Sequence, residues 1–399
     1  MDRPGFCILP FTTLYCENNR VRLCCESEER TEINLSKDVG IADVWNNDFY
    51  KDIRQQMLDG KLPKACKICR LNEEVGEESK RQWENKNYTK LIEDIQNYQS
   101  VVVDSPVNFD VRPSNKCNLE CVMCDGVVST AIIKRVDEYK QRNNLEDFVI
   151  SSGVDWQENH YIINHVKQNS DKIRMMKFCG GEPFLTKEVV DIIEYLVESG
   201  NAPNIRLAFI TNGTVVRSRW FSEMLVHFED VKLNVSVDGV GSVAEYVRYP
   251  TKWSVVDKNL QLFKKLETEH SNIRLSLAPV IHLLNALHIH EVIEYAAVND
   301  INIALSPVYQ ASDEQHLDVS LLTDELRQTA YQRVQEVLAK HPDISFNLGR
   351  GFINHLIEME YDPDPGKIDK LRQVVRYWDD HKKTKFKDQY EYLNYLLDK

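Results

Sequence analysis

Three cysteines in one short segment have the spacing in this chain that points most directly to chemistry. Cys117, Cys121 and Cys124 lie in RPSNKCNLECVMCDG with the pattern C-x3-C-x2-C. Three thiolates on one loop can bind three corners of a [4Fe–4S] cluster, which leaves the fourth iron without a protein ligand. Because such an iron can take a ligand from outside the protein, the spacing predicts a reactive cluster and not only an electron store.

A zinc site is the alternative for these three cysteines. Structural zinc takes four Cys or His ligands, usually from closely spaced pairs. The nearest further candidates along the chain, His160 and Cys179, do not follow Cys124 closely. The sequence therefore favours the iron–sulfur cluster over zinc.

A second motif follows a β-like run. It consists of Gly180, Gly181, Glu182 and Pro183 in MMKFCGGEPFL. The two motifs together resemble those of the radical SAM superfamily. The resemblance implies that the amine and carboxylate of S-adenosylmethionine (SAM) bind the open iron, while the GGEP segment holds the amine. Glycines let the backbone approach a ligand closely, and Glu182 can accept a hydrogen bond from an ammonium group; a solvated surface glutamate is the alternative.

Further SAM contacts are implied by the resemblance. It places Met123 near the adenine, although a buried core methionine is an equal alternative. Asn212 and the pair Ser236 and Asp238 follow two later β-like runs and would meet the ribose and carboxylate of SAM. Arg248 could form a bidentate pair with the SAM carboxylate, or an ordinary surface salt bridge.

Six more cysteines lie in the first seventy residues. Four thiolates from a hairpin, a loop and a C-x2-C turn can bind all four corners of a second [4Fe–4S] cluster. The set favoured by this pattern is Cys7, Cys24, Cys66 and Cys69. Cys25 is the rival of Cys24, since neighbouring side chains on a strand point to opposite sides. Cys16 is interpreted as a small buried apolar residue, and a structural zinc ribbon is the alternative for the whole group.

This N-terminal segment resembles the twitch or SPASM type of auxiliary-cluster module. The matching features are Cys7 with the following Pro10 and Phe11, the adjacent Cys24 and Cys25, the region of Trp45 and Arg54, and the Cys66–Cys69 pair. In that family the module usually follows the barrel, whereas here it precedes it. Asn19 stands where the module has a glycine, and asparagine also tolerates a left-handed turn.

Composition limits the possible partners. The chain has 399 residues, 42% of them hydrophobic, and a net charge of −13. An acidic chain argues against nucleic acid as a partner, because phosphate contacts need a surplus of Lys and Arg. No apolar run approaches the ~20 residues of a membrane span. The N-terminus lacks the pattern of a signal peptide, so metal-binding cysteines in a reducing, cytoplasmic compartment are expected.

The order of strand-like and helix-like patterns predicts an α/β fold. Short β-like runs at 107–113, 172–179, 205–214, 231–239, 273–280 and 301–308 alternate with helical patterns at 127–142, 187–198, 217–228, 253–269 and 287–299. Such alternation predicts a parallel sheet wrapped by helices, and six units predict a partial (βα)6 TIM-like barrel, as the resemblance also implies. Motifs at the carboxyl ends of strands fit this fold.

Four segments are expected along the chain. Residues 1–85 would form the cysteine-rich module, 86–104 a connector, 105–310 the partial barrel and 311–399 a helix-rich extension. The Lys and Glu runs at 73–91 and 381–390 are interpreted as solvated helix faces.

The resemblance implies reductive cleavage of SAM to a 5′-deoxyadenosyl radical that abstracts a hydrogen atom from the substrate. The electron would come from a flavodoxin- or ferredoxin-like reductant, and oxidation or bond formation would follow. A peptide or protein side chain is the favoured substrate. A small molecule such as an aminosugar is the alternative, and a non-catalytic metal-binding scaffold is a hypothesis from another class.

Overall fold

The computed structural model divides the chain into two compact units, which are described one at a time. It describes residues 5–27, 34–36, 38–74, 76, 78–98, 100–146, 148–153, 156, 160–307, 315–344, 356 and 359–398. The first unit comprises 1–114, 156–208 and 223–230, and the second comprises 115–155, 209–222 and 231–399. The expected boundary at residue 85 therefore falls inside the first unit.

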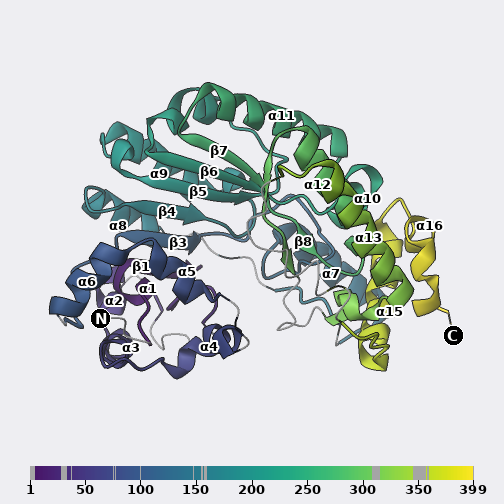
Figure 1. Ribbon diagram of the computed structural model, residues 1–399, viewed down its shortest axis with the longest axis horizontal. Coiled ribbons are helices and arrows are strands. Elements are labelled where there is room, and N and C mark those ends of the chain that lie inside the picture. The colour runs from purple at the N-terminus through teal and green to yellow at the C-terminus, as the bar shows by residue number, and fades with distance from the viewer. Residues whose placement is uncertain are drawn as a thin grey trace. The chain divides into compact units, whose positions relative to one another are not determined.

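The first unit contains a mostly parallel sheet. Its strands lie in the order β2-β1-β3-β4, with the bounds β1 Thr13–Glu17, β2 Arg20–Arg22, β3 Asn108–Arg112 and β4 Met175–Phe178. Figure 1 shows β1, β3 and β4 side by side in that order. β1 pairs in parallel with β3, and β3 in parallel with β4, while β2 turns back antiparallel to β1. The N-terminal cysteine segment thus contributes two strands to the sheet, which the sequence did not predict. The left-handed residue of the β1–β2 turn is Asn18, with φ 55°, and not Asn19.

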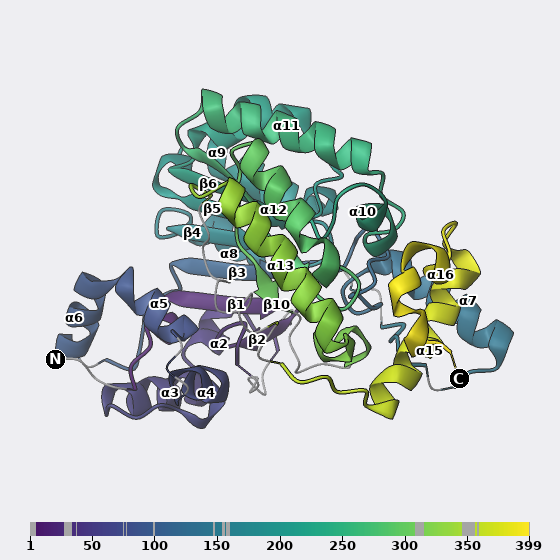
Figure 2. The ribbon, with the colours of Figure 1, turned by 45° about the vertical axis from the view of Figure 1, so that its right-hand side comes forward.

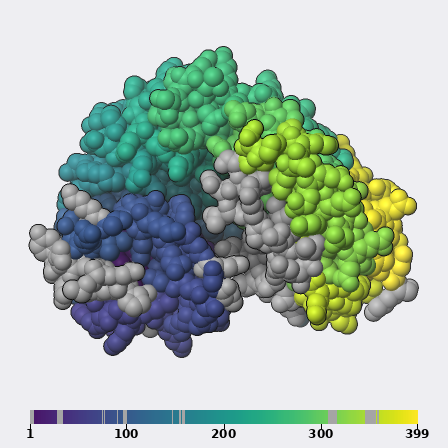
Figure 3. Space-filling view, viewed as in Figure 1, coloured from purple at the N-terminus to yellow at the C-terminus, as the bar shows by residue number. Residues whose placement is uncertain are grey.

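The described α-helices of the first unit lie before, between and after these strands in the sequence. They are α1 Leu9–Thr12, α2 Ile41–Trp45, α3 Asp48–Leu58, α4 Lys67–Glu74, α5 Lys80–Lys86, α6 Thr89–Tyr98, α8 Tyr161–Asn169 and α9 Lys187–Glu198. The early helices form much of the purple-to-blue surface in Figure 3. α9 has the bounds that its periodicity predicts, because Val189, Ile192, Ile193 and Leu196 form one buried face.

Arg54 on α3 connects the N-terminal helices through buried hydrogen bonds. Its side chain is fully buried and lies 4.5 Å over the Trp45 ring. It donates to the carbonyl oxygens of Pro10 at 2.8 Å, Trp45 at 2.8 Å and Val101 at 3.0 Å. One planar guanidinium therefore joins three backbone segments that lie far apart in the sequence.

The second unit also contains parallel strands. β6 Asp230–Val235, which begins at the unit boundary, β7 Ile273–Leu277 and β9 Asn302–Ile303 lie side by side in that order. The short strands β8 Val280–Ile281 and β10 Ser306–Pro307 form a separate parallel pair. β5 Arg206–Thr211 starts in the first unit and ends in the second, where Thr211 accepts a hydrogen bond from the Ser236 amide at 2.9 Å.

The helices of the second unit are α7 Thr130–Asn143, α10 Gly241–Val247, α11 Trp253–Glu269, α12 Ile289–Val298, α13 Asp324–Lys340, α15 Pro365–His381 and α16 Phe386–Gln389. α7 lies beside α15 (Figure 2), where Tyr139 and Tyr377 meet edge to face. α11 has the predicted bounds. The helix predicted at 217–228 is instead a π-helical turn, Trp220–Met224, followed by a 3-10 turn. Adjacent Trp220 and Phe221 are both buried, which favours an irregular turn over one helical face.

The alternation of strands and helices confirms the predicted α/β fold with mostly parallel strands. Closure of six strands into a partial barrel stays a prediction. Among the described helices, none is both long enough and apolar enough to cross a membrane.

Candidate functional site

Backbone hydrogen bonds fix the loop that carries Cys117, Cys121 and Cys124 in the second unit. The Glu120 amide donates to the Tyr249 carbonyl at 2.6 Å, and the Val122 amide donates to the Val247 carbonyl at 2.9 Å. The hydroxyl of Ser129 donates to the Leu119 carbonyl at 2.6 Å. The loop is therefore held against the end of α10 and the start of α7.

The three thiols of the loop interact with one another. The Cys124 amide donates to the Cys121 carbonyl at 3.1 Å, which places both cysteines on one turn. A hydrogen bond from the Cys124 thiol lowers the pKa of Cys121, and Arg248 lowers it further against the effect of burial. The same hydrogen bond and burial raise the pKa of Cys124, and Cys117 raises it again. The donor set thus fits three thiolate corners of one cluster.

Arg248 and Asp238 form a buried ion pair beside this loop. Arg248 Nη2 lies 2.6 Å from Asp238 Oδ2, and the Asp238 side chain is fully buried. Nη1 of the same arginine lies 3.8 Å from the Cys121 sulfur. Asp238 also accepts the Val280 amide at 2.7 Å. Arg248, for which the sequence left open the SAM carboxylate or a surface salt bridge, therefore forms a buried salt bridge with Asp238 and lies beside the Cys121 thiol.

Asn212, at the end of β5, contacts the other end of the loop. Its side-chain amide lies 3.8 Å from the Cys117 sulfur and donates to Asn118 Oδ1 at 3.0 Å. Its oxygen accepts the Thr214 amide at 2.9 Å. Ser236 and Met123, two further predicted contacts, are half-buried in the same unit. The predicted residues of the second unit thus lie after the carboxyl ends of its strands or on the cysteine loop, except Arg248, which follows α10.

The C-terminal extension contributes a buried lysine that sequence reasoning missed. Lys382 is 3% exposed and donates to the Tyr246 carbonyl at 2.7 Å, with its ammonium 4.2 Å over the Tyr246 ring. Burial lowers its pKa to about 7, and Cys121 and Glu120 oppose the shift. The neighbouring His381 lies 3.5 Å from Glu120. The interpretation of 381–390 as a solvated face is thus wrong at Lys382, because a run of charged residues does not reveal one buried member.

In the first unit, the GGEP segment turns sharply after β4. Gly180 and Gly181 have φ values of 78° and 53°, which favour glycine. A Cβ on Gly180 would lie 2.8 Å from the Arg112 Cβ. Glu182 is fully buried, and its Oε1 accepts the Phe184 amide at 3.1 Å. The alternative of a solvated surface glutamate is therefore wrong.

The N-terminal thiols meet around Cys7 in the same unit. Burial raises the pKa of Cys7 well above its usual value, and the nearby thiols of Cys24, Cys66 and Cys69 raise it further. Gly5 lets the backbone before Cys7 lie close to the backbone at Lys61, because a Cβ on Gly5 would lie 2.2 Å from the Lys61 carbonyl carbon. Arg81 and Asn85 on α5 both donate to the Phe6 carbonyl at 2.9 Å. These contacts hold the start of the chain beside the segment that carries Cys66 and Cys69.

Cys25 shares Lys80 with Cys24 and differs from it in its other charged neighbours. Burial raises the pKa of Cys25, while Lys80 and Lys177 lower it and Asp110 raises it. The thiols that act on Cys7 are those of Cys24, Cys66 and Cys69, and the assignment of these four cysteines to a second cluster stays a prediction. Cys25 lies near charged side chains of β3 and β4. Cys16 is 1% exposed, and its thiol donates to the Asn18 carbonyl at 3.1 Å.

No group of three or more His, Cys, Asp or Glu side chains in the described ranges is arranged to hold a metal ion. An iron–sulfur cluster differs from a single ion because each thiolate binds its own iron atom. The thiols of Cys121 and Cys124 share a hydrogen bond, and those of Cys24, Cys66 and Cys69 act electrostatically on Cys7, as donors of one cluster would.

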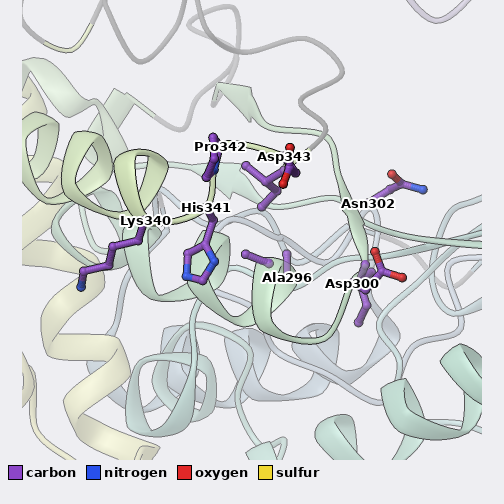
Figure 4. A pocket seen from close by; sticks show the side chains of 10 residues that line it. Ala296, Asp300, Asn302, Lys340, His341, Pro342 and Asp343 are labelled. Atoms are coloured by element: carbon purple, nitrogen blue, oxygen red, sulfur yellow. The ribbon is translucent and has the colours of Figure 1, made fainter.

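A surface pocket of about 290 Å³ lies elsewhere in the second unit (Figure 4). Its lining includes Asp300 and Asn302 beside β9, and His341 and Asp343 after α13. It thus opens at the amino end of β9, whereas the cysteine loop contacts residues that follow the carboxyl ends of β5 and β6. Parallel α/β folds place their chemistry at carboxyl ends, so we do not assign the function to this pocket.

Residues 111–296 match the model of the radical SAM superfamily. The chain therefore carries a radical SAM domain, as the two motifs predict. An uncharacterized protein of Methanocaldococcus jannaschii is 22% identical over 221 residues, which are 54% of this chain and 67% of that protein.

Two solved structures are similar at low TM-scores. Native anSMEcpe with bound AdoMet gives a TM-score of 0.42 at 18% identity and covers 60% of this chain and 64% of that chain. SuiB of Streptococcus suis, bound to the precursor peptide SuiA, gives 0.40 at 12% identity, over 80% of this chain and 66% of that chain. This chain therefore spans slightly less than two thirds of either structure.

Proposed function

We propose that this protein is a radical SAM enzyme that abstracts a hydrogen atom from an unactivated carbon of its substrate. The observation that carries the proposal is the arrangement of Cys117, Cys121 and Cys124 as interacting thiols on one braced loop. This loop lies inside the range that matches the radical SAM superfamily. When bound there, a reduced [4Fe–4S] cluster supplies the electron that cleaves SAM to methionine and a 5′-deoxyadenosyl radical.

The chain's own residues bind and orient SAM. Gly180 and Gly181 bring the backbone close to the SAM amine, which Glu182 accepts as a hydrogen-bond donor, and Pro183 stiffens the turn. Met123 contacts the adenine of SAM. The region of Asn212, Ser236 and Asp238 lies against the ribose and carboxylate of SAM. Arg248 is oriented by Asp238 and keeps positive charge beside the Cys121 thiolate. These residues hold the 5′ carbon of SAM against one C–H bond of the substrate and exclude other hydrogen donors.

Cys7, Cys24, Cys66 and Cys69 bind a second [4Fe–4S] cluster in this proposal. Their thiols cluster around Cys7, and metal binding would offset the cost of burying thiolates. A second cluster accepts the electron that a substrate radical must lose, so oxidation or bond formation would follow. Cys25 is left out of the ligand set because Lys177 and Asp110 act on it, whereas Cys66 acts on Cys24. A flavodoxin- or ferredoxin-like protein is the proposed reductant, and a peptide or protein side chain the proposed substrate.

The decisive experiment is anaerobic loading with iron and sulfide, followed by reduction with dithionite in the presence of SAM. We expect 5′-deoxyadenosine and methionine by mass spectrometry. C117A, C121A or C124A should abolish both products, while C16A, which removes a buried thiol outside both sets, should retain them. Release of S-adenosylhomocysteine instead would contradict the proposal. A mass shift in candidate peptides would then support a peptide substrate. Turnover of an aminosugar without a mass shift in any peptide would instead favour a small-molecule substrate.

The second cluster is tested by counting iron and acid-labile sulfide. Two cubes give about eight iron atoms per chain. Replacing Cys7, Cys24, Cys66 and Cys69 together should leave about four, with the absorption of the first cluster retained. C25A should keep the full iron content. Unchanged iron in the fourfold variant would rule out the second cluster and leave SAM cleavage to be judged separately.

A further inference from the structure

One face of the sheet in the first unit is polar. The register of β1, β3 and β4 places Tyr15, Asp110 and Lys177 in one row across the three strands. Glu17 and Arg112 form the next row, which Cys179 continues beyond the end of β4. The opposite face is apolar and buried; it carries Leu14, Cys16, Phe109, Val111, Met176 and Phe178. Strands of parallel sheets are usually apolar on both faces, so the polar face needs a reason.

The polar side chains are paired with one another over short distances. Lys177 Nζ lies 2.8 Å from Asp110 Oδ2, and the Cys179 sulfur lies 3.7 Å from Asp110 Oδ1. Asp110 and Cys179 are 7% and 5% exposed. Groups of this kind are costly to bury unless they are satisfied. Their retention on one face is typical of a binding site for a polar ligand.

Arg112 has a longer ion-pair distance than Lys177 on this face, and its side chain also bonds the Cys179 thiol. Its guanidinium lies 3.6 Å from Glu17 Oε1, while Glu17 Oε2 already bonds Arg22 at 2.6 Å. Arg112 Nε is buried and makes no hydrogen bond to the described residues. The side chain keeps 31% of its surface exposed. A planar guanidinium in this state matches the two oxygens of a carboxylate.

Cys25 approaches the same charged groups from the N-terminal segment. Its thiol interacts with Lys80, Lys177 and Asp110, and Lys177 interacts in turn with Cys179. Cys25 is half-buried, so small reagents can reach it. Two thiols that belong to neither proposed ligand set therefore flank Lys177 and Arg112, and they can report on which molecules this face attracts.

We propose that this face, formed by Asp110, Arg112, Lys177 and Cys179, binds a carboxylate of the substrate. Arg112 binds the carboxylate directly. Lys177, which is paired with Asp110, adds positive charge beside it. The proposal rests on the proposed function in that it names a group of the substrate of that reaction. A peptide substrate would supply the carboxylate from an acidic side chain or a C-terminus, and a small molecule from an acid group.

The test compares two alkylating reagents that differ in charge. Iodoacetate carries a carboxylate and iodoacetamide does not. The reactivity of a given thiol cancels in the ratio of the two rates, and glutathione supplies the ratio for a free thiol. The full chain as purified is treated with each reagent, and tandem mass spectrometry resolves Cys25 from Cys24. We expect the iodoacetate-to-iodoacetamide ratio of Cys25 or Cys179 to exceed that of glutathione several-fold.

Variants assign the effect to the face. R112M and K177M should bring the ratio down toward that of glutathione, while K187M, which removes an exposed lysine of α9 paired with Asp191, should leave it raised. A wild-type ratio equal to that of glutathione, or one that R112M and K177M leave unchanged, overturns the proposal. Circular dichroism checks that each variant is folded.

A second arm separates the substrate from SAM, whose own carboxylate has the same chemistry. The labelling is repeated with excess SAM on the iron-loaded protein. An unchanged ratio supports a substrate carboxylate, whereas loss of the iodoacetate preference assigns the face to SAM and overturns the proposal. Because labelling requires no SAM cleavage, failure of this inference is distinguishable from failure of the proposed function.

Discussion

The guanidinium of Arg248 lies 2.6 Å from the carboxylate of the fully buried Asp238. Burial raises the pKa of Asp238, and Arg248 opposes that rise. The other side of the guanidinium lies 3.8 Å from the Cys121 sulfur. One buried arginine thus links a strand-end carboxylate to the cysteine loop, and its positive charge also lowers the pKa of the Cys121 thiol.

Removing Arg248 should destabilise the second unit. R248M leaves Asp238 buried without its cation, which costs about 3–5 kcal/mol when one partner of a buried pair is lost. The double variant R248M/D238N should recover much of this loss because no buried charge remains. Urea unfolding followed by circular dichroism measures both. R274M on the exposed surface of β7 is the control, and equal losses in R248M and R274M would contradict the role of the pair.

Lys382 should make stability depend on pH in the protein without iron. Its pKa is about 7 in the folded state and about 10.4 in the unfolded state. Between these values the unfolded chain binds more protons, so the contribution of Lys382 to stability rises as pH increases from 7 to 10. Below pH 7 the full cost of the buried ammonium is present.

K382M removes this dependence. Relative to wild type, we expect the variant to gain free energy of unfolding on the order of 4 kcal/mol at pH 7, falling toward zero near pH 10. Urea unfolding at pH 7, 8, 9 and 10 measures the difference. K383M replaces the exposed neighbour and should show no such trend. A constant difference between K382M and wild type across the series would show that Lys382 does not titrate in this window.

Local patterns in the sequence predicted much of the fold. The bounds of α9 and α11 follow from their apolar periodicity, while the second cysteine ligand set stays a prediction. The pairing of β1 with β3 did not follow, because partners almost a hundred residues apart leave no local signal. Lys382 was missed for a related reason: its burial depends on the ring of Tyr246, which is distant in sequence.

Arg54 should dominate the stability of the N-terminal helices. R54M leaves the buried carbonyls of Pro10, Trp45 and Val101 without donors, and each unsatisfied group costs about 1–3 kcal/mol. We expect a total loss of about 3–5 kcal/mol. R54K should recover little, because an ammonium cannot reproduce the planar fork. Thermal unfolding measures both variants. A loss of unfolding free energy below about 1 kcal/mol in R54M, less than three unsatisfied groups should cost, would contradict this role.

At the GGEP turn, the backbone of Gly180 lies close to the side chain of Arg112. Gly180 and Gly200 both have positive φ, at 78° and 74°. Alanine is strained at either position, at a cost of about 1 kcal/mol or more. Only at Gly180 does the added Cβ meet a neighbour, 2.8 Å from the Arg112 Cβ, whereas Gly200 faces open space.

The difference between G180A and G200A therefore reports the contact alone, because the backbone strain is common to both. We expect G180A to lose about 1–3 kcal/mol more than G200A in urea unfolding, the usual cost of overpacking. G180A should also weaken SAM binding in equilibrium dialysis, since the turn must shift away from Arg112, while G200A should bind SAM like wild type. Equal losses in the two variants would mean that Arg112 moves aside freely, and that Gly180 is required for its backbone angle and not for the space it leaves.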